Sequence, residues 1–470
     1  MHFAPCSRNG ISMSMKQTRH AENPPEPALL HAESGPPACR APNPPLAAQS
    51  GMRLLYTSIW TVLLPFALMR LWWRARKEPE YLASAGQRIG LFDRVDHAPP
   101  TLWVHAVSVG ETRAAAPIVT ALRAHYPQHR ILITQMTASG RMTARSLYGD
   151  FAELAWLPWD LPWAQRHFLR RWRPQLGIVM ETEIWPNLIL ECNRADVPIV
   201  LVNARLSARS AARYALAPAF IRRALAGFSH IVAQTQADAE RLVSLGARQV
   251  SVAGNVKFDI TPPPPQREQG AAWRKAVGGR KVILLASTRD GEEALLLDAL
   301  LSQLPTDVLI ALVPRHPQRF DEVAALVTTR GLSLCRRSTD TLPAADTRVW
   351  LGDAMGEMFA WYALADLALI GGSWLPLGGQ NLIEACAVGC PVLIGPHTFN
   401  FAQATEDAIA AGAALRTNDG AGAAREAGRL LADSGALRTM SEAGRAFAQA
   451  HRGATARTMA VIEPLLREAT

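Results

Sequence analysis

Short apolar runs alternate with helical patterns along most of this chain, in two successive series. Each run is apolar enough to form a strand of a parallel sheet that helices cover on both faces. The predicted strands are residues 101–107, 131–134, 176–180, 199–202, 230–233, 282–286, 308–313, 367–370 and 392–394. This alternation predicts an α/β chain with two doubly wound, Rossmann-like domains.

A proline-rich segment separates the two series. Residues 261–266 read Thr-Pro-Pro-Pro-Pro-Gln, a stiff stretch that suits a connection between domains. We therefore expect an N-terminal domain over 78–260, a linker over 261–266 and a C-terminal domain over 267–470. A length of 470 residues fits two cores with additional terminal segments. Two such domains that face each other bind ligands in a central cleft, at the carboxyl ends of their strands.

Two unlike segments precede these domains. Residues 1–51 are rich in proline and lack apolar periodicity, which predicts a disordered extension. Residues 54–69 are apolar and uncharged, and a basic cluster that ends at Lys77 follows them. We expect a membrane-anchor helix over 52–77, as a tilted span or as an interfacial helix, with a buried helix of a soluble domain as the alternative. The basic cluster favours a cytoplasmic location for the rest of the chain.

Acidic side chains follow two predicted strands of the first series. Glu111 comes after Ser108 and Gly110 at the end of the first strand, and Glu181 and Glu183 come directly after the third. We expect these side chains at the cleft, where Glu111 is the best candidate for a general base. A glutamate that caps the following helix fits the same position equally well. A second carboxylate, Glu181 or Glu183, permits a division of acid and base roles.

A glycine-rich turn and a basic loop follow strands of the second series. Residues 370–385 combine a buried strand, a turn that contains Gly379, and a helix start with Glu384. Free N–H groups there attract a phosphate, and a carboxylate accepts hydrogen bonds from ribose hydroxyls, which predicts a nucleotide site. A glycine turn without a ligand is the alternative. Arg315 suits an anion, and His316 is either a proton donor or a hydrogen-bonded loop residue.

The remaining patterns concern charge. The turn at 356–358 begins a helix whose free backbone groups suit a base or a phosphate. Arg205, Arg209 and Arg213 recur every four residues, which predicts a basic stripe along one helical face that meets lipid phosphates. The net charge of +9 favours anionic partners but is low for a nucleic-acid protein, and no nucleic-acid module is recognisable. No Asp-x-Asp metal motif follows a strand, so we expect neither metal nor cofactor.

Several of these segments, in this order, resemble the 3-deoxy-D-manno-oct-2-ulosonic acid (Kdo) transferases of lipopolysaccharide assembly. The matching segments are HAVSVGE (105–111), ETEIWPN (181–187), NARLS (203–207), PRHP (314–317), GEM (356–358) and GGQNLIEA (378–385). The resemblance runs from about residue 52 to the C-terminus. It implies a GT-B glycosyltransferase fold, a CMP-Kdo donor, a lipid A precursor as acceptor, and attachment to the cytoplasmic face of the bacterial inner membrane. Arg289 stands where the family often has histidine, which leaves the role of that position open.

The resemblance also implies roles for single residues. Glu111 would deprotonate the acceptor hydroxyl in an inverting transfer, and Glu181 or Glu183 would belong to an acidic site on the acceptor side. The substrate-binding positions would be Ser108, Gly110, Arg205, Arg209, Arg315, His316, Gly356, Glu357, Met358, Gly379, Asn381 and Glu384. The N-terminal domain would bind the acceptor and the C-terminal domain the CMP-sugar. The alternatives are a GT-B transferase with another nucleotide-sugar donor and a membrane-anchored nucleotide-binding protein without turnover.

Overall fold

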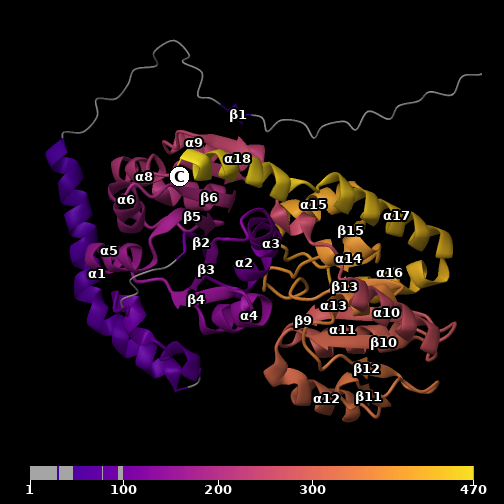
Figure 1. Ribbon diagram of the computed structural model, residues 1–470. Helices are drawn as coiled ribbons and strands as arrows, with labels where there is room; N and C mark the ends of the chain where they lie inside the picture. The colour runs from indigo at the N-terminus through magenta and orange to yellow at the C-terminus, as the bar shows by residue number, and fades with distance from the viewer. Residues whose placement is uncertain (1–28, 31–45, 77, 94–98, 469–470) are drawn as a thin grey trace, which may run out of the picture.

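The computed structural model describes residues 29–30, 46–76, 78–93 and 99–468. Two α/β domains lie side by side, each with a sheet between layers of helices (Figure 1). This confirms the predicted fold class. Most of the proline-rich extension, which we expected to be disordered, lies outside the described residues.

The first sheet has eight strands in the order β1-β8-β7-β6-β5-β2-β3-β4. All described pairs in it are parallel except the one between β1 and β8. Its strands are β1 (Leu29–Leu30), β2 (Thr101–His105), β3 (Arg130–Gln135), β4 (Ala152–Trp156), β5 (Pro174–Met180), β6 (Ile199–Ala204), β7 (His230–Ala233) and β8 (Val250–Val252). Every residue of β2, β6 and β7 is buried, as a sheet covered on both faces requires.

The second sheet has seven parallel strands in the order β11-β12-β10-β9-β13-β14-β15. Its strands are β9 (Val282–Thr288), β10 (Leu309–Pro314), β11 (Leu334–Arg336), β12 (Val349–Leu351), β13 (Leu367–Ile370), β14 (Val392–Ile394) and β15 (Ala414–Arg416). Three tryptophans, Trp273, Trp350 and Trp361, pack together on one face, with ring centroids 4.7–5.0 Å apart. They fill the core with large aromatic surface.

Helices connect the strands and cover both sheets. Those of the first domain are α2 (Val109–Ala114), α3 (Ala116–His125), α4 (Ala138–Tyr148), α5 (Pro162–Trp172), α6 (Pro186–Arg194), α7 (Ala208–Tyr214), α8 (Pro218–Leu225) and α9 (Gln236–Ser244). After them come α10 (Pro264–Ala276), α11 (Glu292–Gln303), α12 (Phe320–Thr328), α13 (Met358–Leu364), α14 (Ile383–Val388), α15 (Ala402–Ala410), α16 (Gly420–Ala432), α17 (Ser434–Ala450) and α18 (Ala454–Glu468). Side chains that accept a backbone N–H fix several starts, namely those of Ser108, Thr137, Ser207, Thr235 and Asp419.

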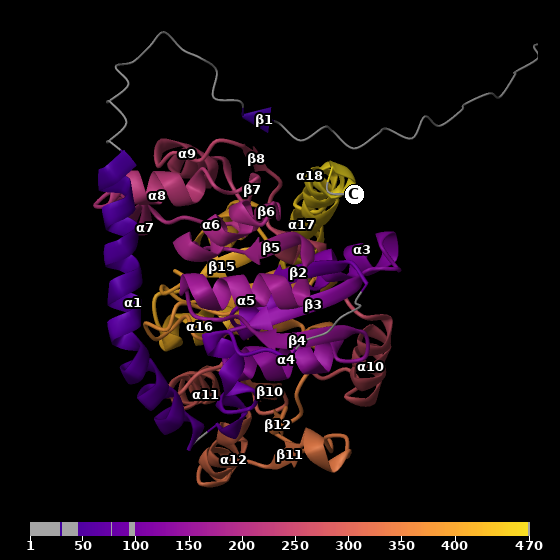
Figure 2. The same cartoon turned by 60° about the vertical axis from the view of Figure 1, so that its left-hand side comes forward.

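The apolar helix α1 (Leu46–Ala75) lies along the outside of the first domain in both views (Figures 1 and 2). It begins before the expected residue 52. Its segment Gly51–Ala75 has a mean hydropathy of 1.5 and is long and apolar enough to cross a membrane, by length and composition. Much of its apolar surface is uncovered, since the side chains of Val62 and Phe66 are 68% and 59% exposed. A buried core helix, the alternative from the sequence, does not fit this exposure.

A polar contact holds the N-terminal half of α1 on the first domain. Arg53 donates to the Asn187 side-chain oxygen at 2.9 Å and to a Glu191 carboxylate oxygen at 2.6 Å. The Tyr56 hydroxyl donates to Asp160 at 2.9 Å, and Asp160 in turn accepts the Asn187 backbone N–H at 2.9 Å. Since Asn187 and Glu191 belong to α6, this contact fixes α1 beside the helix that follows the acidic segment 181–183.

The end of the chain departs from the expected division at 267–470. Helix α17 lies with the second domain, while α18 crosses back to the first (Figure 1). The apolar side chains of Met459, Ile462 and Leu466 pack with β2 and β5. The expected linker over 261–266 also differs from the structure. Helix α10 begins at Pro264 and so includes the last two prolines of that segment.

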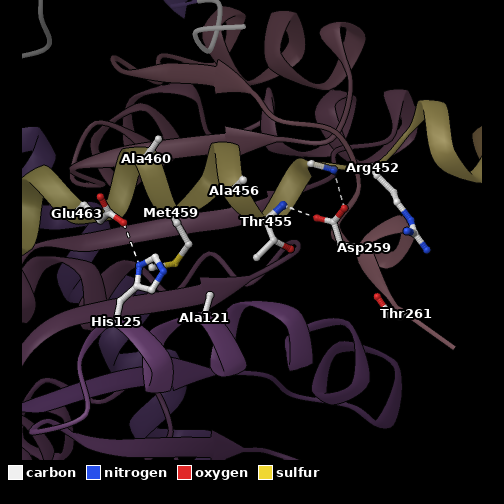
Figure 3. Close-up of a pocket in the computed structure, with 11 residues that line it drawn as sticks. Ala121, His125, Asp259, Thr261, Arg452, Thr455, Ala456, Met459, Ala460 and Glu463 are labelled. Carbon is white, nitrogen blue, oxygen red and sulfur yellow. Dashed lines mark hydrogen bonds and ion pairs between the residues drawn. The ribbon is translucent and has the colours of Figure 1, made fainter. Parts of the chain in front are cut away.

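The start of α18 is tied to the connection between the domains, as Figure 3 shows. Asp259 accepts the backbone N–H groups of Gly453, at 2.6 Å, and Thr455. Farther along α18, Glu463 pairs with His125 of α3 at 3.1 Å. A cavity of about 610 Å³ lies between these contacts, and none of the expected site residues lines it.

Candidate active site

In the first domain, two adjacent strand ends bring three carboxylates together. Strands β2 and β5 are neighbours, with His105 opposite Val179, so the segments that follow them share one edge of the sheet. Glu111 follows β2 and lies on α2, and Glu181 and Glu183 follow β5. The charges of Glu181 and Glu183 act on Glu111 and help to raise its pKa. The structure thus brings these three predicted site residues together at one edge of the sheet.

Glu111 caps its helix and also has the proton affinity of a base. Its carboxylate accepts the Val107 backbone N–H at 2.7 Å and the Ser108 hydroxyl at 2.9 Å, and the Ser108 side chain accepts the Glu111 N–H. Burial raises the pKa of Glu111 to about 7, against the lowering effect of these hydrogen bonds. A carboxylate that titrates near neutrality suits general-base catalysis. The capping interpretation and the chemistry of a base are therefore compatible.

The two other carboxylates have different surroundings. Glu181 adopts a left-handed backbone conformation, with a φ of 59°, and pairs with Lys257 at 2.8 Å. Glu183 accepts the Trp185 indole N–H at 2.6 Å, and burial raises the pKa of its carboxyl, with a smaller contribution from Glu181. The charge of Glu181 is thus balanced by Lys257, whereas Glu183 accepts a hydrogen bond from a neutral indole. Among the described residues, no group of three or more His, Cys, Asp or Glu side chains is placed to hold a metal ion.

In the second domain, the glycine-rich turn follows β13, at the centre of the sheet. β13 pairs with β9, and β9 pairs with β10, so the segments after these strands share one edge. Gly378 and Gly379 have φ angles of 92° and 76°, which glycine adopts without strain. A Cβ at position 378 would also collide with Asn400. The Gly379 N–H donates to the Gly372 carbonyl at 2.7 Å and closes the turn.

A buried carboxylate to which we gave no role from the sequence holds this turn in place. Glu292, in the first turn of α11, accepts the backbone N–H groups of Gly372 and of Trp374, the latter at 3.0 Å. It also accepts the Arg289 N–H at 3.0 Å. The acidic pair Glu292 and Glu293 is visible in the sequence, but the backbone that it binds lies 80 residues away and no local pattern indicates it.

Asn381 and Glu384 lie together at the end of the glycine-rich turn. The Asn381 amide donates to Glu384 at 3.1 Å, while its oxygen accepts the Ile383 N–H at 3.0 Å. Glu384 is half-buried, and burial raises the pKa of its carboxyl, while the charges of Arg113 and Arg315 together with the Asn381 hydrogen bond oppose this effect. Arg113 belongs to the first domain, so the two strand edges meet here.

The two arginines of the basic loop after β10 have different surroundings. Among the described residues, the guanidinium of Arg315 has no hydrogen bond or ion pair, and burial lowers its pKa. Arg319 instead pairs with Glu293 at 2.6 Å and with Glu322 at 3.0 Å. Burial and the neighbouring arginines lower the pKa of His316, which disfavours its protonated form at neutral pH. A proton-donor role for His316 therefore loses support.

The turn at 356–358 lies beside the end of β9. Gly356 has a φ of 91°, and the Met358 sulfur lies 3.9 Å from the hydroxyl of Ser287, the next-to-last residue of β9. Glu357 accepts a hydrogen bond from Arg337 at 2.9 Å. The Glu357 side chain is thus part of an ion pair within the domain, whereas Met358 contacts the end of β9.

The predicted basic stripe is wrong for Arg205. Ser207 caps α7, so the helix starts at Ala208 and Arg205 lies outside it, while Arg209 and Arg213 are exposed on the helix. Arg205 donates to the carbonyls of Phe399, at 3.0 Å, and Asn400, at 2.9 Å, both in the second domain. Arg205 therefore joins the two domains.

Comparisons with known proteins agree with this architecture. Residues 83–260 match the family model described as 3-deoxy-D-manno-octulosonic-acid transferase (kdotransferase). A relative from Bordetella pertussis named 3-deoxy-D-manno-octulosonic acid transferase is 45% identical over 429 residues, which cover 88% of this chain and 99% of the relative. A Haemophilus influenzae protein of the same name is 35% identical over 425 residues, with 88% and 99% covered.

A solved structure supports the fold. A glycosyltransferase from Rickettsia africae superimposes with a TM-score of 0.54 at 13% identity, covering 79% of this chain and 99% of that one. The likeness confirms the expected GT-B arrangement of two Rossmann-like domains. Two sheets with facing strand ends, together with relatives that match over almost their full length, identify this chain as a member of the Kdo transferase family of glycosyltransferases.

Proposed function

We propose that this chain transfers Kdo from CMP-Kdo to a lipid A precursor in lipopolysaccharide core biosynthesis. Family membership supports the sugar and the reaction class. One observation carries the chemistry: Glu111, a carboxylate with a pKa of about 7, lies on one domain, and the glycine-rich turn with Asn381 and Glu384 lies on the other. The general base, Glu111, and the leaving group, CMP, are then held on opposite sides of the reacting sugar.

In the proposed reaction, ionised Glu111 accepts the proton of an acceptor hydroxyl while that oxygen attacks the anomeric carbon of Kdo. The bond between this carbon and the phosphate oxygen breaks, and CMP departs with the electron pair. Arg315, whose guanidinium is unpaired among the described residues, stabilises the charge that develops on the phosphate. Attack from the side opposite the leaving group inverts the configuration of the anomeric carbon.

The donor would lie against the strand ends of the second domain. Gly379 and the backbone of its turn approach the sugar or phosphate, Glu384 accepts hydrogen bonds from the ribose, and Asn381 orients Glu384 at 3.1 Å. The turn at 356–358 lies at the same edge and suits the cytosine ring of the nucleotide. The acceptor would lie against the first domain, near Ser108, Gly110 and the acidic pair.

The membrane helix would bring the acceptor to this site. We infer that α1 attaches the protein to the cytoplasmic face of the bacterial inner membrane, with its exposed apolar side in the lipid. Because Arg53 links α1 to α6, the acidic segment just before α6 is held at a fixed position relative to the helix. A lipid acceptor then reaches Glu111 without leaving the membrane surface.

A donor competition tests the proposal. Purified protein in detergent receives a lipid A precursor together with CMP-Kdo and UDP-N-acetylglucosamine at equal concentration, and mass spectrometry identifies the sugar added. We expect the mass of Kdo on the lipid. Addition of N-acetylglucosamine would assign another donor, and no addition, while a control transferase uses the same CMP-Kdo, would favour a binding protein without turnover.

A further inference from the structure

Three arginines at the facing strand edges lack partners. The guanidiniums of Arg113, Arg289 and Arg315 have no hydrogen bond or ion pair with any residue that the structure describes. Other arginines of the second domain are paired: Arg319 binds Glu293, and Arg337 binds Glu357 at 2.9 Å. Unpaired cations of like charge in one place disfavour each other, and an anion placed between them would relieve this repulsion.

Two of the three arginines follow adjacent strands of the second domain. Arg289 comes directly after β9, Arg315 directly after β10, and the Arg315 N–H donates to the carbonyl of Thr288, the last residue of β9, at 2.9 Å. This hydrogen bond ties the two loops together at the carboxyl edge of the sheet. That edge is where α/β domains of this type bind their ligands.

The third arginine comes from the other domain. Arg113 lies on α2 and is exposed, as is Gly110 three residues earlier, whereas Thr112 and Ala114 are buried. Across the interface, the charge of Arg113 lowers the pKa of Glu384 and that of Arg315. The domains touch nearby through the hydrogen bonds of Arg205 to the carbonyls of Phe399 and Asn400. Arg113 therefore lies close enough to Glu384 and Arg315, across the interface, for their charges to interact.

We propose that Arg113 binds an anionic group of the nucleotide-sugar donor and so completes the donor site from the acceptor-binding domain. The proposal deepens the function proposed above and rests on it. CMP-Kdo carries two anions, the phosphate and the carboxylate of the sugar, and both suit the planar fork of a guanidinium. Arg315 and Arg289 approach the donor from the second domain, and Arg113 approaches it from the first.

This contact has a consequence for catalysis. Arg113 and Glu111 belong to the same short helix, α2, so a donor held by Arg113 is placed at a fixed position relative to the base. Arg113 thus binds substrate and sets the distance over which Glu111 acts. A nucleotide site confined to the second domain would leave the base free to move with the first domain.

The test compares CMP with cytidine, which lacks the phosphate, on the full-length protein in detergent. Calorimetric titrations use the wild type, Arg113→Ala, Arg113→Lys and the control Arg123→Ala, whose guanidinium lies 4.1 Å from the Phe151 ring on the same domain. If Arg113 binds the phosphate, Arg113→Ala weakens CMP binding about ten- to a hundredfold and leaves cytidine binding unchanged. Arg113→Lys should restore part of the loss, and the control should bind both ligands normally.

A kinetic measurement distinguishes the second anion. If Arg113 binds the sugar carboxylate, CMP affinity stays unchanged in Arg113→Ala while KM for CMP-Kdo rises by a similar factor. The proposal is overturned if neither CMP affinity nor donor KM changes, or if cytidine and CMP binding fall together. Failure of the proposed function shows itself separately, because the wild type itself would then transfer no Kdo.

Discussion

The rate of transfer should follow the ionisation of Glu111. Burial, together with the charges of Glu181 and Glu183, raises the pKa of this carboxyl to about 7, and only its ionised form can accept a proton. We therefore expect kcat/KM to be level above about pH 8 and to fall about tenfold for each pH unit below 7. At pH 5 the value should be about one hundredth of the plateau.

A substitution beside the base separates its titration from other pH effects. Glu183→Gln removes a negative charge that raises the pKa of Glu111, so the midpoint of the acid limb should move to lower pH. Glu322→Gln, at an exposed site of the second domain, is the matched control and should leave the midpoint in place. Initial rates of Kdo transfer between pH 5 and 9 would be measured by mass spectrometry. A flat profile, or a midpoint that Glu183→Gln leaves unmoved, would refute this reasoning.

Three further predictions concern the contact between the domains, the glycine-rich turn and the apolar helix α1. Arg205→Ala removes the hydrogen bonds to Phe399 and Asn400 and should raise the donor KM more than it lowers kcat; an unchanged KM would contradict a role of this contact in holding the domains together. Glu292→Gln leaves buried N–H donors of the glycine-rich turn unmatched and should lower the free energy of unfolding by roughly 2–4 kcal/mol, measured by urea titration. An unchanged unfolding midpoint would show that the turn needs no such support. Exchange of the exposed Val62 and Phe66 for serine should weaken vesicle binding in flotation assays about tenfold or more, and undiminished binding would assign attachment to another surface.

Ionisation of Glu111 should also affect stability, in the opposite direction to activity. Because its folded pKa lies above the ordinary value of 4.5, folding favours the protonated form, and stability is lost as pH rises from about 4.5 through about 7. Glu111→Gln should therefore raise Tm relative to the wild type at pH 8 and have little effect at pH 4, as thermal scans would record. An equal change at both pH values would indicate altered packing instead.

Apolar runs were enough to predict the central strands of both sheets. All nine predicted strands are present, because a strand buried on both faces must be apolar throughout. Strands β11, β12 and β15 were missed; each has three residues, and β11 and β15 lie at the edges of the second sheet. Strand β4 alternates with polar residues at its start and was missed for that reason.

Contacts between segments far apart in the chain could not be predicted from the sequence. The apolar side of α18 is visible as a pattern, but nothing local shows that it covers the first sheet and not the second. Likewise, the four-residue spacing of Arg205, Arg209 and Arg213 suggested one helical face. In the structure Ser207 caps the helix, so Arg205 lies before its start. The candidate site was predictable where it depends on strand ends, as for Glu111 and Glu384. It was not predictable where a side chain supports backbone far away, as Glu292 does.

The most direct test of the account is transfer of Kdo by the wild type and by Glu111→Gln in parallel, at pH 8, with CMP-Kdo generated in situ. Lipid products are followed by mass spectrometry, and CMP titrations show that both proteins retain the donor site. We predict Kdo on the lipid A precursor with the wild type, and a rate at least a hundredfold lower with Glu111→Gln at unchanged CMP affinity. Equal rates for the two proteins would contradict the role of Glu111. A wild type that binds CMP and transfers no Kdo would contradict the proposed function.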